Sequence, residues 1–129
     1  MHHSRIFLIF AGFFGLTGII LGALGAHALE EILHARETVV AWETAVRYHF
    51  FHTAALMAAA VWIRLEPSAR LARFGAWCWV AGILIFCGTL YILALGGPGF
   101  LGPVTPAGGI LFMIGWALFG IGAWKTSPA

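Results

Sequence analysis

Three histidines lie in or beside the long apolar stretches of this 129-residue chain, and imidazole is a common metal ligand. His49 and His52 are three residues apart, hence neighbours on one helix face, and His27 ends the preceding apolar stretch. Three converging histidines suffice to hold zinc or copper, and one from each helix could ligate a haem iron. The alternative is that each histidine hydrogen-bonds a carbonyl or a carboxylate, such as that of Glu43, and ties two helices together. We favour this alternative because the histidines have no cysteine or carboxylate at metal-ligand spacing.

Further polar side chains are expected at the same level as these histidines. Glu43 and Arg47 are four residues apart, so they can pair on one helix, which lowers the cost of placing both at a membrane boundary. Ionisable residues inside membrane spans are functional candidates by default. The resulting candidate cluster, which either binds a ligand or ties helices together, is His27, Glu43, Arg47, Tyr48, His49, His52, Cys87, Thr89, Tyr91 and Thr105.

Catalysis has no positive support in the sequence. The chain has no aspartate, and its five carboxylates are all glutamates. No Ser-His-acid or Cys-His arrangement is indicated by spacing, and no glycine pattern follows a strand. Cys78 and Cys87 are nine residues apart on one predicted helix, too far for a disulfide, and are interpreted as small buried hydrophobic residues.

The composition indicates that the elements holding these residues lie in a membrane. Hydrophobic residues make up 61% of the chain and charged residues only 9%, whereas a soluble domain carries about 25% charged residues. The net charge of +2 includes no basic run that could follow a phosphate backbone, which argues against nucleic-acid binding. The length favours a single domain, residues 1–129.

Charge-free stretches divide the chain into four predicted spans, each long enough to cross about 30 Å of hydrocarbon. We expect an all-α, integral membrane, antiparallel four-helix bundle. Its spans are residues 6–29, 43–63, 74–95 and 107–124, and a glycine- and proline-rich loop at 96–109 separates the last two. Arginine and lysine are concentrated on the side that holds both termini, which predicts that N- and C-termini are cytoplasmic. The residues with this bias are Arg5, Arg64, Arg70, Arg73 and Lys125.

The first loop is predicted to be an amphipathic segment in the outer membrane interface. Apolar residues fall on one side of a helical wheel, opposite Glu30, Glu31, His34 and Glu37. Arg36 lies within the apolar stripe, and we interpret it as a snorkelling side chain rather than a substrate gate.

Glycines recur at helical spacing in the predicted spans, and small residues let helices approach closely in lipid. Gly18 and Gly22 form a GxxxG pair. The glycines predicted to line packing faces are Gly12, Gly15, Gly18, Gly22, Gly25, Gly75, Gly82 and Gly115.

Several motifs together resemble one known family. They are GALGAHAL at 22–29, AVRYHFFH at 45–52, FCGTLY at 86–91 and TPAGG at 105–109, with the Gly115-Trp116 pair. In this order they are similar to the YgdD/YwdK family of small bacterial membrane proteins, the domain of unknown function 423, which also includes animal transmembrane protein 256. The resemblance covers nearly the whole chain and implies a four-helix protein of the cell (bacterial inner) membrane, with no known activity. The chain departs from the family at Cys87, where serine is more usual.

Three functions are compatible with these patterns. The first is a non-enzymatic accessory or structural subunit of a larger membrane complex, which small size and the lack of a catalytic constellation favour. The second is a small-molecule or ion binding or transport protein, possibly a homo-oligomer, with a polar His/Tyr site at the outer end. The third is metal or haem binding by His27, His49 and His52. No cofactor is required by the sequence. The lipid bilayer is an expected partner, and the first two functions add a larger membrane protein complex or further copies of this chain.

Overall fold

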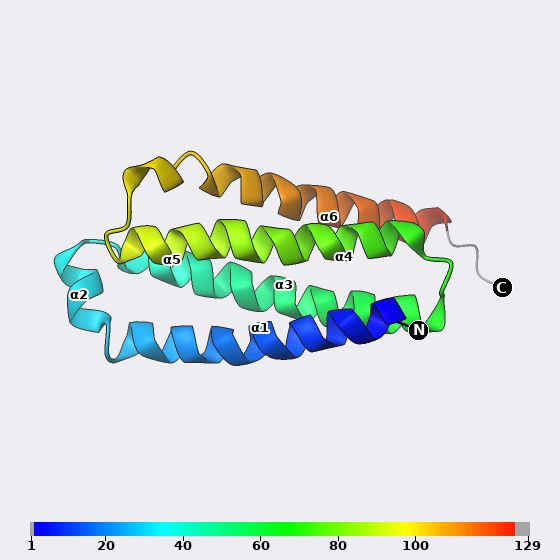
Figure 1. Cartoon of the computed structure of the whole chain (residues 1–129), viewed down its shortest axis with the longest axis horizontal. Coiled ribbons are helices and arrows are strands. Elements are labelled where there is room, and N and C mark those ends of the chain that lie inside the picture. Colours follow the sequence, from blue (N-terminus) through cyan, green and yellow to red (C-terminus); the bar gives the residue numbers. More distant parts are fainter. Residues whose placement is uncertain (1, 126–129) are drawn as a thin grey trace.

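All regular structure in the described part of the chain, residues 2–125 of a computed structural model, is helical. The long helices run side by side along the molecule (Figure 1). The elements are α1 (His2–Ala26), α2 (Glu30–Ala35), α3 (Val39–Leu65), α4 (Arg70–Gly82), the π-helical turn η1 (Ile83–Cys87), α5 (Gly88–Ala94), the 3₁₀ turn η2 (Gly99–Leu101) and α6 (Thr105–Lys125). The segments α4, η1 and α5 follow one another without a break and form one continuous rod.

Three helical segments are long and apolar enough to cross a membrane: His3–Ala26, Arg70–Ala94 and Gly99–Lys125. They correspond to the predicted spans 6–29, 74–95 and 107–124, with bounds that differ by several residues. The first ends earlier, because the chain turns after Ala26 and the Leu29 amide donates to the Leu24 carbonyl over 2.8 Å. The remaining long helix, α3, carries Glu43, Arg47 and two histidines in its first half, which makes it less apolar.

Small residues set the packing between helices. A Cβ on Gly75 in α4 would lie 2.8 Å from the Gly115 carbonyl oxygen of α6, and one on Gly82 would overlap the Phe112 ring. On the other side of the molecule, Gly18 of α1 lies under the Phe50 ring of α3, and a Cβ on Gly25 would overlap the Trp42 indole. These close approaches replace the hydrophobic drive that is missing between helices in lipid.

The remaining predicted packing glycines lie in looser surroundings. Gly22 is near Val46 and Gly15 is near Thr53, both at ordinary van der Waals distance, whereas a Cβ on Gly12 would meet open space. The packing stripe of α1 therefore runs from Gly15 to Gly25, and Gly12 lies outside it.

One end of the molecule, here called the α2 end, is closed by α2 and the loops beside it (Figure 1). Leu33 of α2 is only 1% exposed, and the Thr38 hydroxyl donates to the Ala94 carbonyl at the C-terminus of α5 over 2.8 Å. The Arg36 guanidinium lies against Gly96, whose φ of +88° is the left-handed conformation that glycine tolerates best. The opposite end, here called the terminal end, holds both ends of the described chain.

Candidate functional site

His49 of α3 is buried between helices and contacts two other helices. Its side chain is 4% exposed, with Nδ1 3.1 Å from the Tyr91 hydroxyl of α5 and Nε2 3.5 Å from the Thr17 hydroxyl of α1. Thr17 uses its only proton on the Phe13 carbonyl, 2.9 Å away, so its oxygen can only accept from His49. In a neutral imidazole Nε2–H then donates to Thr17, and Nδ1 accepts the Tyr91 proton. His49 therefore ties α1, α3 and α5 together.

His52 is 3% exposed and joins α3 to α6 instead. Its Nδ1 is 2.8 Å from the Tyr48 carbonyl and must donate to it, because a carbonyl oxygen only accepts. Nε2 then accepts the indole N–H of Trp116 over 3.1 Å. The ring also stacks on Phe112, with centroids 3.6 Å apart and an interplanar angle of 8°. Both ring nitrogens are thus occupied by protein groups.

The predicted three-histidine metal site is not assembled in this structure. Within residues 2–125 no three His, Cys, Asp or Glu side chains come together at metal-binding distance. The antiparallel register explains this, because Thr17 lies level with His49, and His27 is ten residues further along, about 15 Å on a helix. His27 is exposed in the turn after α1, and His49 and His52 have different helices as neighbours.

Two predicted polar residues form a separate tie near the α2 end. The hydroxyls of Thr89 and Thr105 lie 2.7 Å apart, and Thr89 also donates to the Ile85 carbonyl of η1 over 2.6 Å. Cys87 lies buried within η1 as a free thiol. The structure thus brings together Thr89 with Thr105, and His49 with Tyr91, and it distributes the predicted cluster over several contacts rather than one pocket.

Sequence reasoning did not include Thr17, Trp42, Phe112 and Trp116 in this cluster. Each is a partner in a buried contact: the Trp42 indole donates to the Leu21 carbonyl over 3.0 Å, and Thr17, Phe112 and Trp116 contact the histidines. Of these four, Trp116 could have been selected from the sequence, because it belongs to the Gly115-Trp116 pair among the family motifs. The Trp79 indole N–H is buried and has no partner within the described residues.

Glu43 and Arg47 lie on the exposed side of α3, away from these contacts. Tyr48 is exposed too, but its ring stacks on His52. Over residues 2–125 the structure places no ion pair between Glu43 and Arg47, although they are one turn apart. Their spacing allows such a pair, but the structure does not form it. As exposed side chains, they gain little from pairing with each other, because water and side-chain entropy oppose it.

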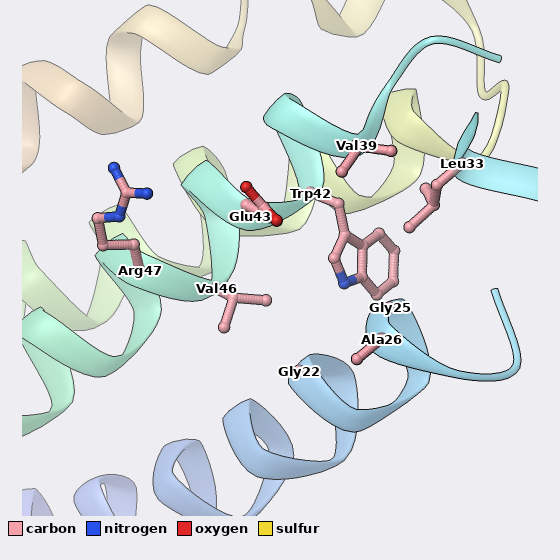
Figure 2. Close-up of a pocket in the computed structure, with 9 residues that line it drawn as sticks. All are labelled: Gly22, Gly25, Ala26, Leu33, Val39, Trp42, Glu43, Val46 and Arg47. Carbon is pink, nitrogen blue, oxygen red and sulfur yellow. The ribbon is translucent and has the colours of Figure 1, made fainter. Parts of the chain in front are cut away.

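Arg47 stands between two grooves. The first, of about 640 Å³, lies between α3 and α6, and its walls include Tyr48, His52, Phe86, Met113 and Trp116. The second, of about 430 Å³, lies between α1, α2 and α3 near the α2 end (Figure 2). Its lining is Gly22, Gly25, Ala26, Leu33, Val39, Trp42, Glu43, Val46 and Arg47. One exposed strip of α3, with a carboxylate and a guanidinium, thus separates two grooves.

A family model described as "Protein of unknown function (DUF423)" matches residues 21–109, more than half of the chain. The chain belongs to the DUF423 family. It is 39% identical to the UPF0382 inner membrane protein YgdD of Escherichia coli (strain K12), over 93% of this chain and 90% of YgdD. It is 34% identical to the UPF0382 membrane protein YwdK of Bacillus subtilis (strain 168), over 94% of this chain and 98% of YwdK. No solved structure matches the chain.

Membership of DUF423 confirms the predicted family and makes the chain a membrane protein with transmembrane helices. The matched residues 21–109 include both grooves' charged residues and both buried histidines, and they end before Phe112 and Trp116. The DUF423 family has no assigned activity, so a function has to be inferred from the structure.

Proposed function

We propose that α3 is a fourth membrane span and that the α2 end faces the outside of the cell. The 27 residues of α3 are about 40 Å long, more than the roughly 30 Å of hydrocarbon. His49, His52 and Thr53 face the bundle interior, where protein groups satisfy them. Arg5, Arg64, Arg70, Arg73 and Lys125 lie toward the terminal end, which the positive-inside rule places in the cytoplasm.

In this arrangement α2 lies in the outer interface. Leu33 turns inward, whereas Ile32 and Val40 are exposed and available to the lipid boundary. The apolar surface of the long helices lies at the level of the acyl chains. One domain with four spans, residues 1–129, then accounts for the whole chain.

Within this membrane protein, the groove between α3 and α6 binds an amphipathic molecule with an acyl chain. The observation that carries this proposal is the lining of the groove. Its long walls are apolar, with Phe51, Ile110, Phe112 and Met113, while Arg47 and Tyr48 lie at its end nearer the α2 end. A volume of about 640 Å³ is within the range of ligand sites.

The polar groups inside the groove support binding rather than proton chemistry. His52 is held by the Tyr48 carbonyl and the Trp116 indole, and its ring is covered by Phe112. His52 therefore sets the distance between α3 and α6 and so the width of the groove. Arg47, by contrast, is exposed and can meet the head of a bound molecule.

The test fills the groove without adding charge. Gly109 lines the groove, and a Cβ there would meet the Phe86 ring only at ordinary distance, so Gly109→Leu extends into free space. Gly120→Leu is the matched control on the same helix, because a Cβ there meets nothing within 4 Å and Gly120 does not line this groove. The measurement is saturable quenching of tryptophan fluorescence by a brominated fatty acid in detergent.

We expect saturable quenching in the wild type and in Gly120→Leu, and a several-fold weaker affinity in Gly109→Leu. Trp116→Phe should remove part of the quenching, because Trp116 lines the groove. Equal affinities in both leucine variants would overturn the proposal.

A second candidate function is an accessory subunit of a larger membrane complex. The observation that favours it is the outer face of α1, where the missing side chain of Gly12 leaves open space beside exposed Phe13 and Leu16. A partner helix could approach closely there. Extraction in mild detergent tests it: co-migration with a larger complex that Gly12→Leu abolishes supports this function, and migration as an isolated protein argues against it.

A further inference from the structure

Two opposite charges on α3 lie unpaired beside the proposed amphiphile groove: Arg47 lines this groove, and Glu43 lies one helical turn away. Glu43 and Arg47 are both exposed, and within residues 2–125 neither carries an ion pair with the other. Both side chains project from α3 beside the α1–α2–α3 groove (Figure 2). Arg47 also lines the α3–α6 groove, whereas Glu43 does not. In a membrane boundary, unpaired charges are costly and tend to acquire partners.

The order of the two charges along the helix is informative. α3 begins at Val39 at the α2 end, so Glu43 lies nearer that end and Arg47 lies one turn, about 6 Å, deeper. A membrane lipid approaching this strip presents its acyl chains at the deepest level, its phosphate above them and any amine outermost. Arg47 therefore lies at the level of a phosphate, and Glu43 at the level of a head-group amine.

We propose that the groove selects a phospholipid whose head group carries a primary ammonium two carbons from its phosphate, as in phosphatidylethanolamine. This inference rests on the proposed function of the α3–α6 groove and names its ligand class. The Arg47 guanidinium binds the phosphate oxygens, which its planar donors fit well. The Glu43 carboxylate accepts hydrogen bonds from the ammonium. An acyl chain lies in the α3–α6 groove, along Phe51 and Met113.

The Tyr48 hydroxyl adds a third contact. Tyr48 is 42% exposed and lines the same groove, and within the described chain its hydroxyl has no hydrogen-bond partner. A phenol O–H at this position can donate to the ester carbonyl that joins an acyl chain to the glycerol. The groove, through Arg47 and Tyr48, and the neighbouring Glu43 thus offer one polar contact for each successive polar part of such a lipid.

The charge pattern distinguishes the common head groups. An anionic head group without an amine, such as phosphatidylglycerol, can bind the Arg47 guanidinium through its phosphate. It has no ammonium to donate hydrogen bonds to the Glu43 carboxylate. Phosphatidylcholine carries a positive charge but has no N–H to donate, so its contact with Glu43 is weaker. Only the primary ammonium satisfies both side chains.

The experiment measures which lipids stay bound. The full-length protein is reconstituted with equal amounts of phosphatidylethanolamine, phosphatidylcholine and phosphatidylglycerol, extracted in mild detergent, and its retained lipids are quantified by mass spectrometry. We expect the wild type to enrich phosphatidylethanolamine at least about threefold, as a partly exposed ion pair allows. Glu43→Gln removes that preference, and Arg47→Gln lowers the retention of all three lipids.

Matched controls carry the same changes outside the groove: Glu30→Gln on exposed α2 and Arg64→Gln near the terminal end retain the wild-type pattern. The exchanged variant Glu43→Arg with Arg47→Glu keeps the net charge and the fold but inverts the order of charges, so it loses the enrichment. Retention in proportion to supply in the wild type, or an unchanged preference in Glu43→Gln, overturns the inference.

Failure of this inference is distinguishable from failure of the groove itself. If Gly109→Leu still weakens binding of the brominated fatty acid while no head group is preferred, the groove binds acyl chains and the head-group assignment is wrong. If Gly109→Leu has no effect on acyl binding, the proposed function fails as well.

Discussion

Nε2 of His52 accepts the indole N–H of Trp116 over 3.1 Å, and this hydrogen bond links α3 to α6 across the base of a groove. The other nitrogen of His52 is held by the Tyr48 carbonyl of its own helix, so the imidazole is fixed in one tautomer. Both nitrogens of this buried imidazole are thereby occupied by hydrogen bonds to the protein.

Removing the indole donor tests this link. Trp116→Phe keeps a large aromatic ring but leaves Nε2 of His52 without a partner, and should cost about 1 kcal/mol of unfolding free energy. Trp124→Phe is the control, because Trp124 is almost fully exposed, and should be near neutral. Equilibrium unfolding in mixed micelles measures both, and equal stabilities would contradict the role assigned to the bond.

The two tyrosines of the chain form a second matched pair. Tyr91→Phe removes the proton donated to Nδ1 of His49 at 3.1 Å and should destabilise the protein by roughly 0.5–1.5 kcal/mol. Tyr48→Phe removes a hydroxyl that has no partner within residues 2–125 and should leave the unfolding free energy nearly unchanged. A larger loss in Tyr48→Phe than in Tyr91→Phe would show that the hydrogen bonds are wrongly assigned.

Close approach of α4 and α6 predicts a strong effect at Gly115. A Cβ there would overlap the Trp79 indole and lie 3.0 Å from the Gly75 carbonyl oxygen, so Gly115→Ala should destabilise by about 1–3 kcal/mol. Gly120→Ala on the same helix meets nothing within 4 Å and should be neutral or slightly stabilising, since alanine favours helix. Thermal denaturation in detergent compares them, and tolerance of Gly115→Ala would refute the packing.

The loop after α5 offers a backbone test. Gly96 has a φ of +88°, and a Cβ there would also overlap the Arg36 guanidinium, so Gly96→Ala should cost about 1–2 kcal/mol. Gly99→Ala nearby has no atom within 4 Å of its Cβ and should cost less. Limited proteolysis of the loops at the α2 end reports the difference. Identical cleavage rates in the two variants would argue against the observed conformation of Gly96.

The apolar runs predicted the positions of the helices well, because few charges interrupt them. They placed the helix ends less well, because the predicted bounds were set at charged residues, whereas α3 extends back to Val39 ahead of Glu43 and α4 extends back to Arg70. A charged residue does not end a helix as long as backbone hydrogen bonding continues, as from the Trp42 amide to the Thr38 carbonyl.

Residue types alone identified His49, His52 and Tyr91, because ionisable and polar groups in apolar stretches are conspicuous. Their partners were not predictable in the same way. Thr17 and Trp116 reach the histidines from α1 and α6, and which residues lie level depends on the register of antiparallel helices. Register also separated His27 from the others, and a single sequence does not specify it.

The π-helical turn at Ile83–Cys87 changes the direction in which the following side chains of the α4–η1–α5 rod point. A π-turn accommodates about one extra residue per turn, and one residue corresponds to about 100° of rotation on a helix. Everything after Cys87 is thus rotated relative to a regular helix, and this rotation directs Thr89 toward Thr105 and Tyr91 toward His49. Deleting one residue from this turn would make the rod more regular and yet misalign both ties, so this segment tolerates a change of side chain better than a change of length.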